Sequence, residues 1–294
     1  MTTDPPPGPE AGAPTARLPG PAQALLAYLG LVVFYQAAGA VLTVRGWPPV
    51  ATLPLLHGGV LFGGSLILAR AQGAPLRETF FWRLPRSGSD LILAVIAVAA
   101  LGAILADLAW VQDLAFRKLG MNTRPAMEDV NRQISRLTEY GPAAALGLVA
   151  VLPAVCEETL FRGYLLTGFR RDWGAGAGIA MSSVLFGLMH AFVPDKILMQ
   201  TLQGVLFGYL VVRTGSLWPS VTAHFVNNAA IVLLMMLSPT EPAEIASDVM
   251  PVPLPNLAVA GIALVACLWG IGKSGVPLPQ SPKEGGGFED KSKL

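Results

Sequence analysis

Charged residues are scarce in this sequence. They make up 13% of its 294 residues, whereas hydrophobic residues make up 53%. Soluble domains contain about 25% charged residues, so the composition disfavours a soluble globular protein. The formal net charge is only +1, and without a basic excess the chain has no strong electrostatic attraction for nucleic acid. We therefore expect membrane lipids, and no nucleic acid, among its partners.

Cysteine and histidine are also rare. The two cysteines, Cys156 and Cys267, both lie in apolar segments, which argues against a disulfide framework. The chain has three histidines and no HExxH sequence, the arrangement that places two zinc-binding histidines on one helix turn. The first histidine, His57, falls in an apolar run, and we expect it to be a packing or interfacial residue.

Long apolar runs dominate what remains. A membrane-spanning helix needs about 20 mostly apolar residues, and runs of this kind predict an all-α fold, a polytopic membrane helix bundle of about eight transmembrane helices. The expected spans are residues 21–44, 50–69, 91–111, 142–166, 174–193, 196–212, 217–237 and 257–271.

The two ends of the chain differ from this pattern. Residues 1–20 are rich in Pro, Gly and Ala, and residues 273–294 are polar and rich in Gly, so both are predicted to be disordered tails around a bundle at 21–272. The first apolar run could instead be a signal peptide, because residues 38–40 resemble a cleavage site. It has no basic cluster before it and is too long, so we favour a membrane anchor.

Lysine and arginine indicate the orientation. Eight spans put both termini on one side, and the segments on that side carry more Lys and Arg, which predicts cytoplasmic termini. Segment 112–140 argues the other way, because it is also basic. Its apolar residues recur at helical spacing, which predicts a short amphipathic helix lying on the surface. These residues are Met127, Val130, Ile134 and Leu137.

Three charged residues interrupt the fourth span. Glu157, Glu158 and Arg162 lie in or beside an apolar run, where each charge costs about 2.5–3.5 kcal/mol at the bilayer centre, so a functional role is the default interpretation. Glu158 and Arg162 are spaced i,i+4 and can form an ion pair on one helix face. Glu157 points about 100° away and is left without a partner on its own helix, which suits a general base. Cys156 beside it is expected to be a packing residue.

Further polar residues interrupt the next spans. His190 follows Phe186 at i,i+4, and His224 precedes Asn228 at the same spacing, so each pair shares a helix face. A single buried histidine is usually a satisfied core residue. Two of them beside a Glu-Glu-Arg helix, in spans that follow one another closely, favour one shared site.

These three stretches resemble the motifs of the CAAX-protease and bacteriocin-processing family (CPBP, or Abi) of intramembrane glutamic-type endopeptidases. The family shows EExxxR, FxxxH and HxxxN or HxxxD on successive helices, and the chain has all three in that order. The resemblance covers about residues 142–237, the expected protease core. It implies a peptide hydrolase in which Glu157 activates water and Glu158 with Arg162 orients the site. His190, His224 and Asn228 would hold the water and the oxyanion.

Two alternatives remain open at this stage. Glu157, His190 and His224 could be three zinc ligands with an open position for water, although we favour a mechanism without a metal or other cofactor. The protein could also be a non-catalytic membrane scaffold or regulator. A proton-coupled transporter is disfavoured, because the two halves show no clear repeat.

The substrate is the least defined part of the prediction. The resemblance implies a protein or peptide at the membrane, lipidated or with a hydrophobic C-terminal tail, as in CAAX-like processing, trimming of sorting tails or peptide maturation. The high use of Ala, Gly, Pro and Arg is typical of a GC-rich genome. We therefore expect a multi-pass protein of a prokaryotic inner or plasma membrane.

Overall fold

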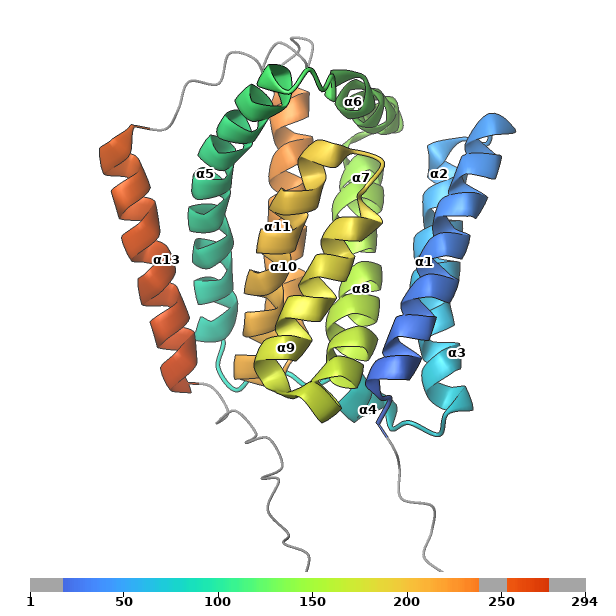
Figure 1. Cartoon of the computed structure of the whole chain (residues 1–294), viewed down its shortest axis with the longest axis vertical. Helices are drawn as coiled ribbons and strands as arrows, with labels where there is room; N and C mark the ends of the chain where they lie inside the picture. The colour runs from blue at the N-terminus through green and yellow to red at the C-terminus, as the bar shows by residue number, and fades with distance from the viewer. Residues whose placement is uncertain (1–17, 238–252, 275–294) are drawn as a thin grey trace, which may run out of the picture.

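The chain forms a bundle of long helices that stand side by side (Figure 1). This computed structural model describes residues 18–237 and 253–274, and these residues contain helices and no strand. The tails predicted to be disordered fall almost entirely outside the described residues. The fold class expected from the sequence, an all-α membrane bundle, is confirmed.

The helices follow the predicted spans closely. The first two spans form a hairpin. The first span is α1 (Pro21–Val44), and the second consists of α2 (Pro49–Leu53), η1 (Pro54–Gly63) and α3 (Gly64–Ala71). After the short α4 (Leu76–Thr79) come α5 (Ser89–Lys118), α6 (Arg124–Thr138), α7 (Pro142–Ala145), η2 (Leu146–Val151), α8 (Leu152–Glu158), η3 (Thr159–Leu165), α9 (Leu166–Met189), α10 (Pro194–Thr214), α11 (Trp218–Leu237) and α13 (Leu254–Ser274). Of these, α5 is longer than predicted at both ends.

One continuous helical segment crosses the bundle twice. Seven segments in the described residues are long and apolar enough to span a membrane, and the longest, Pro142–Met189, has 48 residues. A straight helix of that length would measure about 70 Å, more than twice the ~30 Å hydrocarbon core. The segment reverses at Gly174, where φ is 82° and ψ is 171°. Seven apolar segments therefore give eight passes, as the sequence predicts.

Packing across this reversal is close. A Cβ atom built on Gly178 would lie 3.0 Å from the Cβ of Arg170, although residues eight apart in a straight helix are separated by about 12 Å. The two arms of the turn therefore run antiparallel. The Pro21 end of α1 and the Ser274 end of α13 lie at the same end of the bundle (Figure 1), which agrees with termini on one side of the membrane.

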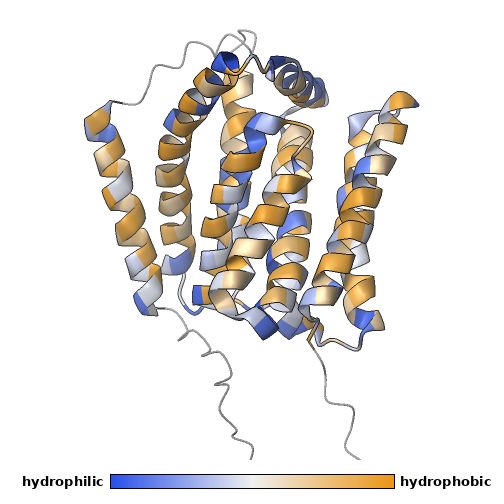
Figure 2. Cartoon of the chain, in the orientation of Figure 1, coloured by the Kyte–Doolittle hydropathy of each residue, from blue (hydrophilic) through white to orange (hydrophobic). Residues whose placement is uncertain are grey.

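Apolar side chains cover the outer surface of the bundle. The long helices are mostly hydrophobic in Figure 2, whereas hydrophilic residues gather at helix ends and in α6. Large apolar residues stay exposed on the outermost helices, for example Phe34 at 59%, Ile262 at 71% and Trp269 at 63%. A soluble monomer rarely exposes so much contiguous apolar surface, so this surface is suited to lipid. The protein is thus a multi-pass membrane protein.

The amphipathic helix predicted within segment 112–140 is present as α6. It lies across one end of the bundle, at a large angle to the long helices (Figure 1). It packs against α2, α7 and α11, and Leu137 is its buried apolar contact. The predicted helical spacing is therefore confirmed, and α6 uses its apolar face against protein helices.

Proline and π-helical segments mark the two helices that contribute most polar residues to the interior. The π-helical segment η1 begins at Pro54, and η2 ends just before Pro153. Proline has no backbone N–H, so the carbonyl four residues earlier loses its helical donor. Wider π-helical turns often occur at functional sites. In these irregular segments two backbone carbonyl groups, those of Leu53 and Val149, accept hydrogen bonds from side chains.

We expect the reversal at Gly174 to require glycine. Its φ/ψ combination is essentially restricted to glycine, and other residues pay about 1–3 kcal/mol there. Gly174→Ala should therefore lower the free energy of unfolding in detergent by that amount. Gly176→Ala is the matched control, because a Cβ there meets no atom within 4 Å, and alanine should stabilise this helix by about 0.5–1 kcal/mol. Equal unfolding temperatures for the two variants would contradict the assigned turn.

Candidate active site

A buried ion pair lies at the centre of the bundle. Arg162 Nη1 donates a hydrogen bond of 3.0 Å to Glu158 Oε1, and both side chains are 0% exposed. The two residues are one helical turn apart, across the junction of α8 and η3. The ion pair predicted from their i,i+4 spacing is therefore present.

Two residues of α11 complete the environment of Glu158. His224 Nδ1 lies 3.0 Å from Glu158 Oε1, and Ser220 Oγ donates to Glu158 Oε2. Because a carboxylate oxygen is an acceptor, Nδ1 of His224 carries the hydrogen and Nε2 is left as an acceptor. Ser220 was missed in the sequence analysis. The signal was its position four residues before His224, on the same helix face.

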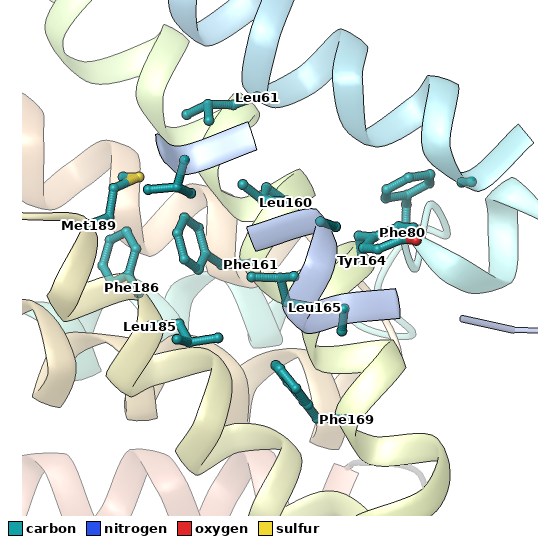
Figure 3. Close-up of a cluster of buried hydrophobic side chains, with 14 of the residues drawn as sticks. Leu61, Phe80, Leu160, Phe161, Tyr164, Leu165, Phe169, Leu185, Phe186 and Met189 are labelled. Atoms are coloured by element: carbon teal, nitrogen blue, oxygen red, sulfur yellow. The ribbon is translucent and has the colours of Figure 1, made fainter. Parts of the chain in front are cut away.

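Aromatic rings surround the guanidinium group of Arg162. Its Cζ lies 4.3 Å from the centroid of Phe186, 5.3 Å from Phe207 and 5.9 Å from Phe161. Figure 3 shows Phe161 and Phe186 next to each other within the buried apolar cluster. Among the described residues, Nε and Nη2 of Arg162 have no hydrogen-bond partner. Ring faces attract cations and take the place of these missing partners.

Glu157 is buried and its contacts come from other helices. His57 Nε2, on η1, lies 3.2 Å from Glu157 Oε1, and His224 Nε2 lies 3.8 Å from Glu157 Oε2. Both of these side-chain partners come from other helices, as the direction of Glu157 on its own helix predicts. His57, expected to be a packing or interfacial residue, is buried, and it also meets Glu157, one hundred positions away in sequence.

His190 lies at the end of α9, beside the same site. Its Nδ1 is 3.0 Å from the Phe186 carbonyl oxygen, so this nitrogen is the donor and Nε2 is left as an acceptor. The imidazole ring meets the Phe186 ring edge-on, with 5.2 Å between centroids. Phe186 thus lies against both histidines, since its ring is also 5.9 Å from that of His224.

Asn228 is held by the helix that carries Glu157. Its Nδ2 donates a bond of 3.1 Å to the carbonyl oxygen of Val149. In a regular helix this carbonyl would accept from residue 153, but Pro153 has no N–H. Asn228 replaces the lost donor and joins α11 to η2. Its second Nδ2 hydrogen stays available.

A chain of amides supports Asn228 from α10. Gln203 Nε2 donates to Asn227 Oδ1 at 2.9 Å, and Asn227 Nδ2 donates to Asn228 Oδ1 at 3.2 Å. Gln203 and Asn227 were not among the predicted site residues. Asn228 donates to the carbonyl oxygen of Val149 and accepts from Asn227, and these two hydrogen bonds fix the orientation of its amide group.

Cys156 belongs to the apolar surroundings of the site. It is a free, buried cysteine in a cluster that also contains Leu160, Phe161 and Phe186. The predicted packing role agrees with this position.

No group of three or more His, Cys, Asp or Glu side chains in residues 18–237 and 253–274 is arranged to hold a metal ion. The alternative zinc ligands Glu157, His190 and His224 therefore do not form a ready-made coordination site in this arrangement. The Nδ1 atoms of both histidines are engaged, with Phe186 and with Glu158 respectively. We derive no catalytic step through a metal.

Comparison with known proteins points to one family. Residues 140–230 match the family described as "Type II CAAX prenyl endopeptidase Rce1-like". The chain is also similar to the "Putative membrane peptidase YdiL" of Bacillus subtilis (strain 168), with 26% identity over 87 residues. That match covers 30% of this chain and 35% of the relative, so the chain matches about a third of the length of this curated relative. No solved structure matches.

The matched segment contains Glu157, Glu158, Arg162, His190, His224 and Asn228, but it does not contain His57. The family resemblance predicted from the three motifs is therefore confirmed. The roles of the individual residues stay predictions. The structure brings Glu157, Glu158, Arg162 and His224 into direct contact, with His190 beside them. Asn228 is linked to them through the backbone of η2.

We expect the buried ion pair to be required for stability. Arg162→Met leaves Glu158 buried without its countercharge, which should cost about 3–5 kcal/mol of unfolding free energy. Adding Glu158→Gln removes the unpaired charge, so the double variant should lose less than the sum of the two single variants. The measurement is denaturant unfolding in detergent of all three variants.

Arg132→Met is the control for this cycle. Arg132 forms its ion pair with Asp129 at the surface, with both side chains at least 60% exposed. Pairs of this kind contribute about 0–1 kcal/mol, so the change should be small. Additive losses in the Glu158/Arg162 cycle would contradict a coupled pair.

Proposed function

We propose that this protein is an intramembrane endopeptidase that uses Glu157 to activate water. The observation that supports this most strongly is the buried contact of Glu157 with His57 and His224, next to the fully buried Glu158–Arg162 pair. Ionisable residues inside a membrane bundle are costly and mark functional sites. The family match over residues 140–230 includes Glu157, Glu158, Arg162, His190, His224 and Asn228, whereas His57 lies outside it.

The proposed water lies beside Glu157 Oε2 and His224 Nε2. These atoms are 3.8 Å apart, too far for a direct hydrogen bond and close enough for one water to contact both. Glu157 takes a proton from this water while the oxygen of the water attacks the carbonyl carbon of the peptide. The water donates one hydrogen to Glu157 and the other to Nε2 of His224, and His190 lies beside them against the shared Phe186 ring. A general base of this type contributes about 10²–10⁴-fold to the rate.

Collapse of the tetrahedral intermediate completes the reaction. The carbon–nitrogen bond breaks, and the proton taken by Glu157 passes to the leaving amine nitrogen, so the water is divided between the two products. The Asn228 amide, which keeps one N–H, stabilises the oxyanion. One such donor is commonly worth about 3–4 kcal/mol. Glu158, held by Arg162, Ser220 and His224, keeps the His224 ring oriented.

The proposed substrate is a membrane-associated protein or peptide. A buried site surrounded by apolar residues is reached most easily by a segment that is itself apolar or lipidated. We propose substrates with a prenylated cysteine near the C-terminus, or with a hydrophobic C-terminal tail, in a prokaryotic plasma membrane with both termini of the enzyme in the cytoplasm. A short peptide that is cleaved during its maturation is the third proposed class of substrate.

The proposal predicts that Glu157→Gln abolishes peptide cleavage. Wild type in lipid nanodiscs should cleave members of a quenched-fluorescence peptide library that includes prenylated peptides and peptides with hydrophobic tails. Glu157→Gln preserves the shape of the side chain and removes the base, so the rate should fall by at least about 100-fold. Glu139→Gln, the same change at an exposed residue, should retain the wild-type rate.

Absence of cleavage by wild type across the library, together with full complementation of a deletion strain by Glu157→Gln, would refute the peptidase function. That result would favour a membrane scaffold or regulator.

Treatment with a chelator distinguishes the metal-free mechanism from the zinc-dependent one. We expect cleavage to continue after dialysis against EDTA, because the proposed steps use side chains and water alone. Loss of cleavage in EDTA, with recovery on addition of Zn²⁺, would instead assign Glu157, His190 and His224 as metal ligands. Total metal in the purified protein, measured by mass spectrometry, provides an independent check.

A further inference from the structure

The first hairpin of the bundle contributes a histidine to the site, although it lies outside the residues that match the family. His57 is on η1, which packs against α8. Its Nε2 is 3.2 Å from Glu157 Oε1, and the two side chains are 5% and 7% exposed. Such a contact between two buried ionisable groups from separate helices is not explained by apolar packing.

The orientation of the His57 ring is fixed on its other side. Nδ1 lies 3.3 Å from the carbonyl oxygen of Leu53, which can only accept a hydrogen bond. Nδ1 therefore carries a hydrogen and Nε2 is turned to Glu157. For Glu157 to act as the proposed base its carboxylate must be ionised, so the hydrogen between Nε2 and Glu157 Oε1 is carried by His57, and this hydrogen bond fixes the rotation of the carboxylate.

Tyr35 on α1 supports the same ring. The rings of Tyr35 and His57 meet edge-on, with 5.2 Å between centroids and an interplanar angle of 90°. Tyr35 Oη lies 3.3 Å from Nε2 and 3.4 Å from Nδ1 of His57. The adjacent Gln36 donates through Nε2 to the carbonyl oxygen of Met189, next to His190. Helix α1 thus contacts the site at His57, through Tyr35, and next to His190, through Gln36.

We propose that His57 is a positioning residue that holds Oε1 of Glu157 and so presents Oε2 to the water and the substrate. Oε2 is the oxygen that faces His224 Nε2. If Oε1 were free, the carboxyl group could rotate and lose this alignment, and a misplacement of about 1 Å can cost 10²-fold in rate. This inference rests on the proposed peptidase function. It extends the machinery to a helix pair that the family match does not include.

The test compares two replacements of His57 in the full-length protein in nanodiscs. His57→Leu has no polar atom, so kcat should fall by about 10–100-fold with KM nearly unchanged, because Glu157 does not bind substrate in the ground state. His57→Gln places an amide N–H near the position of Nε2 and should recover most of kcat. Tyr35→Phe keeps the ring contact and removes the hydroxyl group, so its loss should be smaller than that of His57→Leu.

Leu61→Ala is the matched control for packing. Leu61 is one turn after His57 and fully buried, but it makes no polar contact. We expect this variant to lower the unfolding temperature at least as much as His57→Leu, with kcat retained. A loss that follows the unfolding temperature across the variants, or equal rates for His57→Gln and His57→Leu, would overturn the positioning role.

The outcomes for this role and for the peptidase function are distinct. If wild type cleaves, Glu157→Gln does not, and His57→Leu keeps the wild-type kcat, the proposed function stands and the role of His57 fails. If Glu157→Gln cleaves as well as wild type, the proposed function fails and the role of His57 fails with it. Should His57→Leu not fold, His57→Gln and Tyr35→Phe still decide the result through their kcat and KM.

Discussion

The structure depends on satisfying one charge pair that is withdrawn completely from water. Taking an arginine and a glutamate out of solvent is expensive, and their attraction offsets this cost only with good geometry and further hydrogen bonds. Both carboxylate oxygens of Glu158 accept hydrogen bonds, Oε1 from Arg162 and His224 and Oε2 from Ser220. Three aromatic rings enclose the guanidinium group. Helices α9, α10 and α11 must therefore meet at Arg162 and Glu158, which fixes their arrangement in the centre of the bundle.

Backbone irregularity at this depth in the bundle follows the same rule. In a bilayer an unpaired carbonyl costs several kcal/mol and must find a partner within the protein. Pro153 removes the donor for Val149, and Asn228 supplies another. Within the π-helical segment η1, the ring of His57 donates to the carbonyl oxygen of Leu53. In both places a hydrogen bond to an irregular helix holds a polar side chain in one orientation. The hydrogen bonds to the irregular backbone thus fix the positions of these side chains.

The site is assembled from two parts with different relationships to known proteins. The helices from α7 to α11 carry the three motifs and match the family. The hairpin of α1 and the α2–η1–α3 helix lies outside the match and reaches the same site through Tyr35, Gln36 and His57. Contacts of this kind change the surroundings of Glu157, the proposed base, without replacing it. Because His57 meets Glu157 only through tertiary packing, no local sequence pattern marks it.

Local sequence alone determined the spans, the Glu158–Arg162 pair and the resemblance to a family. Hydropathy runs fix helix lengths because the bilayer imposes one thickness, and i,i+4 spacing fixes which residues share a face. The helix α1 has the predicted bounds, 21–44, for this reason. Pairing between helices had no such local signal. That His57 meets Glu157, that Ser220 binds Glu158, and that Asn228 replaces the donor lost at Pro153 all depend on which helix faces stand opposite each other. Tertiary structure alone decided these contacts, because they join residues from 62 to 100 positions apart.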